Sequence, residues 1–238
     1  MAYQAVFKRY ELKYLITRDQ KQRLLEAMAP YMALDKYGRT TIRNIYFDTP
    51  TYQLIRRSIE KPVYKEKLRI RSYKQARADS AVFVELKKKY NGVVYKRRLS
   101  MHEQDAMDWI CSGSPQPEGQ IGTEIEYFRK FYTGLHPSVF LSYEREAYYC
   151  REGGDFRVTF DDNILCRREA LSLESPVWGH RLLDENLVLM EVKTGGGVPL
   201  WMTQVLTREK IHKTSFSKYG MAYQTMILPE LQGGYTHV

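Results

Sequence analysis

Apolar and polar residues alternate at every second position along much of the chain. In 65–73, Leu68 and Ile70 alternate with charged residues, and in 81–89, Val84 and Leu86 do the same. This period of two is typical of β-strands, because successive side chains of a strand point to opposite faces of the sheet. Strands are therefore predicted at 9–16, 40–48, 65–73, 81–89, 93–101, 138–150, 156–161, 164–168 and 187–193.

One pair of these strands has a clear turn between them. Asn91 and Gly92 separate 81–89 from 93–101. Both residue types tolerate positive φ, which a two-residue type I′ turn requires. The pair predicts a β-hairpin.

Other segments have helical signals. Capping boxes, in which a Ser or Thr is followed three residues later by Glu or Gln, occur at 17–20, 100–103 and 123–126. The first precedes apolar residues at helical spacing, which predicts a helix of about four turns after Thr17. Further helices are predicted at 51–59, 101–111, 123–133, 199–211 and 217–227.

The order of these elements indicates the fold class. Helices are inserted between strands without regular alternation, which favours an α+β fold over a doubly wound sheet. We expect a closed eight-stranded antiparallel β-barrel with inserted and flanking helices. Barrels of this size commonly stay undivided, so residues 1–238 are interpreted as one domain.

The polar positions of the strands carry an unusual set of charges. Lys67, Arg69 and Arg71 share one face of their strand, opposite Leu68 and Ile70. The remaining charged faces comprise Arg9, Glu11 and Lys13; Glu85, Lys87 and Lys89; Lys96 and Arg98; Tyr143 and Arg145; Arg157, Thr159 and Asp161; and Glu191 and Lys193.

Two interpretations of these faces are open. For any single strand, a charged face is most simply the solvent-exposed side of a half-buried sheet. Seven such faces together, rich in Arg and carrying few carboxylates, favour instead a barrel whose apolar side packs on the helices and whose interior is a basic tunnel.

A basic tunnel requires an anion, because confined like charges repel one another. A polyphosphate would balance them, since Arg offers a planar fork for phosphate oxygens and Lys a point charge. The few carboxylates would then be ligands for a hard divalent cation, Mn²⁺ or Mg²⁺, that bridges the phosphate oxygens.

The composition agrees with a polyanionic partner. It also narrows the possible partners, metal sites and cellular locations. The net charge is +9, which alone does not distinguish nucleic acid, acidic lipid and phosphate chains. Nineteen tyrosines raise the alternative of RNA binding by stacking, but no RNP-like motif is present, so no nucleic acid is expected. The three cysteines lack CxxC spacing, which argues against a zinc site. The sequence has no apolar stretch of membrane-spanning length and no apolar signal core, so we expect a cytoplasmic protein.

The motifs on these strands resemble those of a known family. They are YELKYLI (10–16), YFDTP (46–50), KLRIRSY (67–73), FVELKKKYNGVVYKRR (83–98), LSYERE (141–146), FRVTFD (156–161), LMEVK (189–193) and SFSKYG (215–220). In order and spacing they resemble the catalytic domain of the vacuolar transporter chaperone (VTC) polyphosphate polymerase, a triphosphate tunnel metalloenzyme of the CYTH-like superfamily. The resemblance implies an eight-stranded tunnel that cleaves ATP with a divalent metal, lengthens polyphosphate and releases ADP.

The resemblance also implies roles for individual residues. Tyr143 and Ser217 would be hydrogen-bond donors, Glu191 the principal metal ligand, and Glu11 and Glu85 further metal ligands, directly or through water. The phosphate-binding cations would be Lys13, Arg69, Arg71, Lys87, Lys96, Arg145 and Lys218, joined by Arg157 and Lys193 on the same inferred wall. The catalytic set would be Lys13, Arg69, Arg71, Lys87, Arg145 and Glu191.

One departure from the wider superfamily bears on function. The first strand reads Arg9-Tyr10-Glu11-Leu12-Lys13 where the superfamily pattern is Glu-x-Glu-x-Lys. The missing carboxylate favours the polymerase branch over small triphosphatases and cyclases. Two alternatives stay open: a triphosphatase that uses water as acceptor, and a non-catalytic module that binds polyphosphate or inositol polyphosphates.

Overall fold

In the described part of the chain, eight long strands and two short ones form a single antiparallel sheet. The computed structural model describes residues 10–77 and 79–233, so Arg9 of the first predicted strand lies outside the described residues. The strands are β1 (Tyr10–Thr17), β2 (Met32–Asp48), β3 (Tyr64–Ser72), β4 (Ala81–Tyr90), β5 (Val93–His102), β6 (His136–Cys150), β7 (Arg157–Arg167), β8 (His180–Arg181), β9 (Leu187–Thr194) and β10 (Lys213–Thr214). They are hydrogen-bonded in the order β10-β1-β9-β7-β6-β2-β3-β4-β5, with β8 beside β7.

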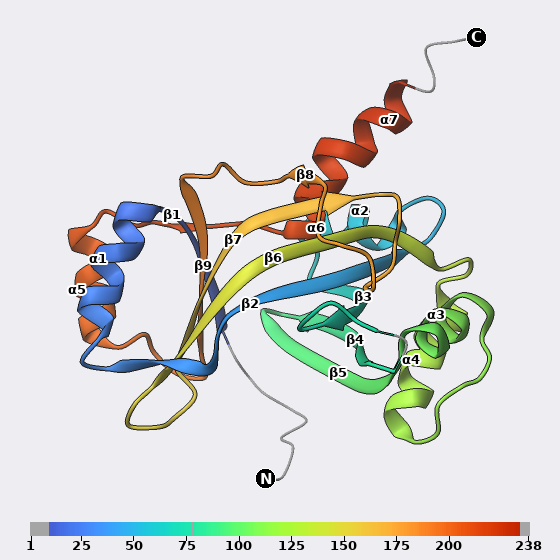
Figure 1. Cartoon of the computed structure of the whole chain (residues 1–238), viewed down its shortest axis with the longest axis horizontal. Coiled ribbons are helices and arrows are strands. Elements are labelled where there is room, and N and C mark those ends of the chain that lie inside the picture. The colour runs from blue at the N-terminus through green and yellow to red at the C-terminus, as the bar shows by residue number, and fades with distance from the viewer. Residues whose placement is uncertain (1–9, 78, 234–238) are drawn as a thin grey trace.

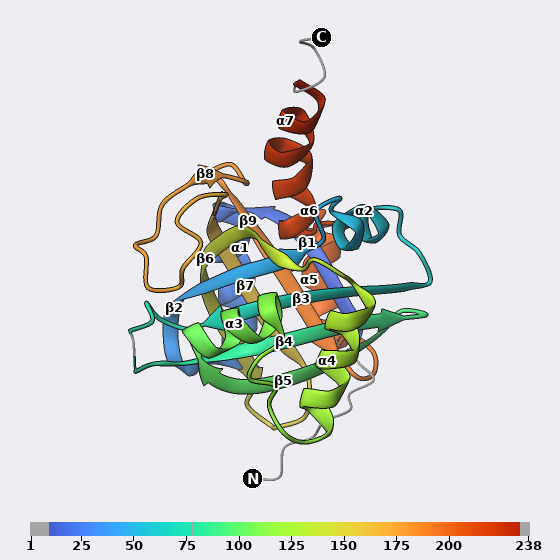
Figure 2. The ribbon, with the colours of Figure 1, turned by 90° about the vertical axis from the view of Figure 1, so that its right-hand side faces the viewer.

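The sheet curls around a central space without closing (Figures 1 and 2). The α+β class is confirmed, but the expected closed barrel is not, since no backbone pairing joins β5 to β1 within the described ranges. The outer edge of β1 is instead occupied by β10, which pairs Lys13 with Thr214. Side chains link the two margins, because Nζ of Lys87 on β4 lies 2.9 Å from Oε2 of Glu11 on β1.

Most helices cover the convex side of the sheet and its ends, and the last one projects away from the sheet (Figure 1). They are α1 (Arg18–Met28), α2 (Gln53–Ile59), α3 (Glu103–Ser112), α4 (Gln120–Phe131), α5 (Leu200–Arg208), α6 (Lys218–Ala222) and α7 (Leu228–Gly233), with a π-helical turn, η1 (Tyr223–Ile227), between the last two. Helices α3 and α4 lie against β4 and β5, and α1 lies against β1, β9 and α5 (Figure 2). None of the helices in the described part of the chain combines the length and apolar character needed to cross a membrane.

The alternation in the sequence corresponds to these two sides of the sheet. Leu68, Ile70, Val84 and Leu86 are fully buried in the core beneath α3 and α4. Since neighbouring residues of a strand point the opposite way, the charged residues between them face the concave side. The arrangement of apolar residues outward and charged residues inward is thus the one expected from the sequence.

The predicted hairpin is confirmed. Tyr90 pairs with Val93, and the two residues between them, Asn91 and Gly92, have φ of 44° and 84°. Positive φ at both central positions is the signature of a type I′ turn.

Only one of the three predicted capping boxes forms. The hydroxyl of Thr17 accepts the backbone N–H of Gln20, whose side chain accepts the N–H of Thr17. Ser100 instead remains in β5, where its backbone continues the ladder with β4, and α3 begins at Glu103. Thr123 lies inside α4, whose first residue is Gln120. Strand pairing therefore overrides the local signal at Ser100, and at Thr123 the helix begins three residues before the predicted cap.

Two predicted strand boundaries are also wrong. Helix α1 ends at Met28, before Pro30, and β2 begins at Met32, eight residues earlier than the alternation indicated. The segments 156–161 and 164–168 form one strand, β7, which continues through Asn163 at φ 45° beside an irregularity in its pairing with β6.

We expect Ile70→Asp to damage the fold, because Ile70 is 0% exposed in the core between the sheet and α3 and α4. A carboxylate without partners at this position should lower the free energy of unfolding by more than about 3 kcal/mol. Chemical denaturation measures the loss, and Val63→Asp, at a side chain that is 67% exposed, is the control. An Ile70→Asp variant as stable as that control would show that this side of the sheet is not packed.

Candidate functional site

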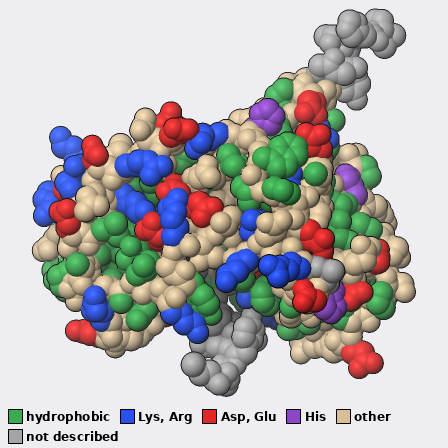
Figure 3. Space-filling view, viewed as in Figure 1, with side chains coloured by type: hydrophobic (Ala, Val, Ile, Leu, Met, Phe, Trp, Pro, Cys, Tyr) green, Lys and Arg blue, Asp and Glu red, His purple; other side chains and the backbone are tan. Residues whose placement is uncertain are grey.

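The concave side of the sheet surrounds a cavity of about 1430 Å³. Among the described residues that line it, thirteen are Lys or Arg and three are Asp or Glu. The outer surface differs, because the face seen in Figure 3 mixes basic and acidic side chains. Cations are therefore concentrated in the cavity, as the tunnel interpretation of the charged strand faces requires.

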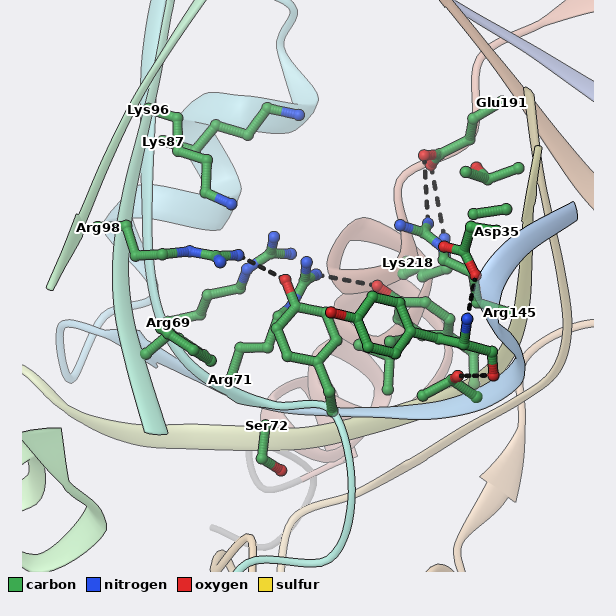
Figure 4. A pocket seen from close by; sticks show the side chains of 18 of the residues that line it. Asp35, Arg69, Arg71, Ser72, Lys87, Lys96, Arg98, Arg145, Glu191 and Lys218 are labelled. Atoms are coloured by element: carbon green, nitrogen blue, oxygen red, sulfur yellow. Dashed lines mark hydrogen bonds and ion pairs between the residues drawn. The ribbon is translucent and has the colours of Figure 1, made fainter. Parts of the chain in front are cut away.

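The labelled side chains in Figure 4 form two groups that face each other across the cavity. We call the first the arginine wall: it comes from β3, β4 and β5 and consists of Arg69, Arg71, Lys87, Lys96 and Arg98. We call the second the carboxylate wall: Arg145, Glu191 and Lys218 face the cavity from β6, β9 and α6, and we include Asp161 of β7, which is buried behind them and is not labelled in the figure.

Glu85 is the counter-ion of the arginine wall. It is 1% exposed, and its Oε2 accepts two hydrogen bonds from Arg69 at 2.7 and 2.9 Å. Its Oε1 accepts a 2.8 Å hydrogen bond from Nε of Arg98 and lies 2.5 Å from Nζ of Lys96. Burial alone would raise the pKa of Glu85, but these cations and Arg71 hold it well below its usual value. A metal ion at Glu85 would have to displace one of these partners.

The two arginines of β3 are held from both sides. Nη1 of Arg69 donates to the hydroxyl of Tyr46 at 2.8 Å. Arg71 donates from Nε to Oδ1 of Asn44 at 2.8 Å and from Nη2 to the hydroxyl of Tyr143 at 2.9 Å. Both guanidinium groups are therefore oriented before any ligand binds.

Asp161 plays the corresponding part in the carboxylate wall. It is fully buried, accepts hydrogen bonds from Arg145 at 2.6 and 2.7 Å, and lies 2.5 Å from Nζ of Lys218. Burial would raise the pKa of this carboxyl, but Arg145 and Lys218 outweigh that effect and lower it. Asp161 shares the charged face of Arg157 in the sequence, yet alternation alone assigned it no role.

Glu191 has looser contacts than the other two carboxylates. It is 5% exposed, and Lys13, Arg145 and Lys193 each lie 3.4 Å away, with Lys218 at 3.6 Å. Burial opposes ionisation, but the surrounding cations, Lys218 foremost, hold the pKa of Glu191 well below its usual value. The carboxylate is thus ionised, and its contacts are longer than direct hydrogen bonds usually are.

Glu11 and Lys87 join the two margins of the sheet beside Glu191. The nearby Lys87 ammonium lowers the pKa of Glu11 to about 2, whereas burial and the charge of Glu191 oppose that shift. In turn, Glu11 raises the pKa of Lys87. Two ionised carboxylates, Glu11 and Glu191, therefore interact at this margin.

Two lysines of the cavity have pKa values near neutrality. Burial, followed by the charges of Lys13 and Lys87, lowers the pKa of Lys67 to about 7. Burial also lowers the pKa of Lys96 to about 7, because the charge of Glu85 only partly offsets it. These ammonium groups would gain charge stabilisation from an added anion.

The C-terminal segment completes one end of the cavity. Nζ of Lys13 donates to the carbonyl of Phe216 at 2.8 Å, and Nζ of Lys67 donates to Oγ of Ser217 at 2.9 Å. The same Ser217 oxygen caps α6 by accepting the backbone N–H of Gly220. Capping fixes the start of α6, which places Lys218 against Asp161.

The structure brings the site residues predicted from the sequence together. Glu85 is not among the lining residues, since it lies buried behind the arginine wall. The others all line the cavity: Glu11, Lys13, Arg69, Arg71, Lys87, Lys96, Tyr143, Arg145, Arg157, Glu191, Lys193, Ser217 and Lys218. Their placement does not test the roles predicted for them.

Several residues of the site received no role from the sequence. Lys67, Arg98 and Asp161 share charged faces with assigned residues, so alternation contained the signal. Tyr46 opens the YFDTP motif and Asn44 lies two residues before it in β2, but the sequence assigned neither of them a role. Their function as partners of Arg69 and Arg71 follows from cross-strand register, which the sequence does not show.

The donor set suits a hard divalent cation. No group of three His, Cys, Asp or Glu side chains with metal-binding geometry occurs in the described ranges. Mg²⁺, however, is usually held by one or two carboxylates, with waters and substrate phosphates as its other ligands. Glu191 and Glu11 fit that pattern. Beside Glu191 in register, the buried hydroxyl of Thr159 has no hydrogen-bond partner among the described residues, which leaves a polar atom for a bound group.

Two solved structures of similar fold cover nearly all of the chain. A candidate adenylate cyclase from Bacillus halodurans is 16% identical with a TM-score of 0.57, covering 90% of this chain and 96% of its own. A candidate adenylyl cyclase from Hippeastrum, reported to have a dominant triphosphatase activity, is 17% identical with a TM-score of 0.57, covering 92% and 96%. At these identities the likeness shows the fold alone. No curated protein matches the chain.

The family suggested by the motifs is confirmed independently of these structures. The VTC domain matches residues 8–227, a span that contains every lining residue of the cavity. The chain therefore belongs to the VTC domain family.

Proposed function

We propose that this protein is a metal-dependent phosphotransferase that moves the γ-phosphoryl group of ATP onto a growing polyphosphate chain in the cavity. The observation that carries the proposal is the excess of cations, thirteen basic against three acidic lining residues. Such an excess in a confined space is costly unless an anion balances it. A chain of phosphates does so along the whole length of the cavity.

The two walls suit different parts of a phosphoryl transfer. Arg69 and Arg71 are held by Tyr46, Asn44, Tyr143 and Glu85, so their donors are aimed before the phosphate arrives. Preorganised donors of this kind stabilise charge that develops in the transition state. In this proposal the arginine wall holds the transferring phosphoryl group.

The carboxylate wall would hold the metal and the neighbouring phosphates. Glu191, whose cation contacts are looser than those of Glu85 and Asp161, would be the principal ligand, with Glu11 beside it. When bound, Mn²⁺ or Mg²⁺ would supply Lewis-acid neutralisation of phosphate charge. Asp161 orients Arg145 and Lys218 toward the same space.

Triphosphate hydrolysis is the second candidate. The Hippeastrum protein of similar fold is reported to be dominantly a triphosphatase, and the same cavity would serve if water replaced polyphosphate as acceptor. The two activities share the binding and orientation of the triphosphate and differ in the nucleophile.

Product analysis separates the candidates. Purified protein is incubated with ATP and Mn²⁺, and ADP, free phosphate and polymer are quantified. Polymer formed in step with ADP supports the polymerase, and free phosphate in step with ADP supports the triphosphatase. Tight ATP binding without turnover would contradict both and indicate a binding module for polyphosphate or inositol polyphosphates.

We expect Glu191→Gln to abolish turnover while ATP still binds. The substitution removes a metal ligand but leaves the basic residues of both walls in place. Activity and ATP affinity are measured in parallel over a metal titration, with Glu152→Gln, an exposed glutamate outside the cavity, as the control. Normal turnover of the Glu191→Gln variant at saturating metal would show that Glu191 is not the metal ligand.

Arg69→Ala and Arg71→Ala should each cost transition-state stabilisation without unfolding the protein. If the guanidinium groups contact the transferring phosphate, each substitution lowers kcat/KM. The ratio of the wild-type to the variant kcat/KM should correspond to a loss of about 2–4 kcal/mol of transition-state stabilisation. Circular dichroism establishes that each variant is folded. Folded variants with full activity would mean that the arginine wall is not a catalytic surface.

Triphosphate affinity should fall as the pH rises through about 7. Lys67 and Lys96 have pKa values of about 7 in the free protein, and a bound anion raises them, so binding takes up protons. Calorimetric titration with tripolyphosphate over a pH series measures the effect. Lys67→Arg, which stays charged, should weaken the dependence, and an unchanged dependence in that variant would exclude Lys67 as its source.

A further inference from the structure

A short segment of β2 leaves the sheet at the rim of the cavity. The pairing of β2 with β6 shifts register between Leu34 and Arg39, and the residues between them form a bulge. Gly38 has φ of 59°, in the left-handed region that glycine adopts at little cost. Bulges of this kind often redirect a side chain beside a functional site.

The bulge is held in one conformation by its own polar groups. The backbone N–H of Tyr37 donates to Oδ1 of Asp35 at 2.9 Å, and the hydroxyl of Thr40 donates to the carbonyl of Tyr37 at 3.2 Å. Nζ of Lys36 lies 5.1 Å from the centre of the Tyr37 ring. The main chain that carries Tyr37 is therefore fixed on both sides of the residue.

Asp35, Lys36, Tyr37 and Gly38 all line the cavity. Figure 4 shows Asp35 on the same side of the cavity as Arg145, Glu191 and Lys218, opposite the arginine wall. The bulge thus lies at the rim next to the carboxylate wall, where the triphosphate is proposed to bind the metal.

Tyr37 differs from the other aromatic residues around the cavity. Tyr46, Tyr143 and Tyr219 are less than 9% exposed, and each has its hydroxyl in a hydrogen bond. Tyr73, also at the rim, is 38% exposed and accepts a hydrogen bond from Arg98. Tyr37 is 69% exposed, and within the described ranges no hydrogen bond engages its hydroxyl.

A phosphate chain gives no reason for such a residue. Phosphates bind cations and N–H donors, whereas an exposed aromatic ring on a fixed main chain suits another planar ring. Nucleobases stack on aromatic side chains, and this interaction tolerates any base because every base has a π-face. A nucleoside triphosphate has both parts, a phosphate chain for the cavity and a base that would lie at its rim.

We infer that Tyr37 is the stacking surface for the base of a nucleoside triphosphate whose phosphates occupy the cavity. This inference rests on the proposed function and adds a second subsite to it. Since stacking reads no hydrogen-bond pattern, the subsite should accept purine bases with little discrimination between them.

The test compares ligands with and without a base. Affinities of ATP, GTP and inorganic tripolyphosphate are measured by calorimetry for the wild-type protein and for Tyr37→Ala, Tyr37→Phe and Tyr127→Ala. Tyr127 is 70% exposed on α4 and does not line the cavity, so it is the matched control.

We expect Tyr37→Ala to weaken ATP and GTP binding about tenfold, since stacking contributes roughly 1–3 kcal/mol per base. Tripolyphosphate affinity should stay nearly unchanged, because tripolyphosphate has no base to stack on Tyr37 and its phosphates would contact the arginine wall and the carboxylate wall. Tyr37→Phe keeps the ring and should bind ATP like the wild type, as should Tyr127→Ala.

Each other outcome overturns a specific claim. If Tyr37→Ala weakens ATP and tripolyphosphate equally, or changes neither, Tyr37 is not a base-stacking residue, although the cavity still binds triphosphate. If the wild-type protein binds none of the three ligands, the proposed function fails and the inference fails with it.

Discussion

The crowding of like charges on the inner side of one sheet is the constraint on which the rest of the structure depends. Lysines and arginines that point into a confined, poorly solvated space repel one another, and they lose part of their favourable hydration. Buried carboxylates offset this cost from behind. Glu85 accepts hydrogen bonds from Arg69 and Arg98, and Asp161 accepts them from Arg145 and Lys218. Each carboxylate also fixes the direction of its cations, so neutralisation and preorganisation come from the same contacts.

The fold serves this constraint by separating the two sides of each strand. Apolar residues such as Ile70 and Val84 pack under α3 and α4, so the charged residues between them have only the concave side to occupy. The sheet does not close through its backbone in the described ranges, and its margins meet through the ion pair of Glu11 with Lys87.

Much of this arrangement can be predicted from the sequence, because alternation is a local property. Short-range rules predict the charged residues of β3 that face the concave side, the hairpin at Asn91 and Gly92, and the helix after Thr17. Short-range rules cannot predict whether the barrel closes, because the strand that occupies the edge of β1 is β10. These two strands lie some two hundred residues apart in the sequence. The same limit applies within the site. In the sequence, Glu85 and Glu191 look alike, because each is a single carboxylate on a charged strand. The cross-strand register distinguishes them: three cations lie close to Glu85, whereas the cations around Glu191 lie farther away.

The central claim is that the cavity binds a triphosphate through many simultaneous ion pairs. Its most direct test is calorimetric titration of the wild-type protein with inorganic tripolyphosphate over a series of salt concentrations. Several cations acting together should make the affinity fall steeply as salt rises, because salt screens each pair. Affinity that does not change with salt, or no binding at low salt, would contradict the claim.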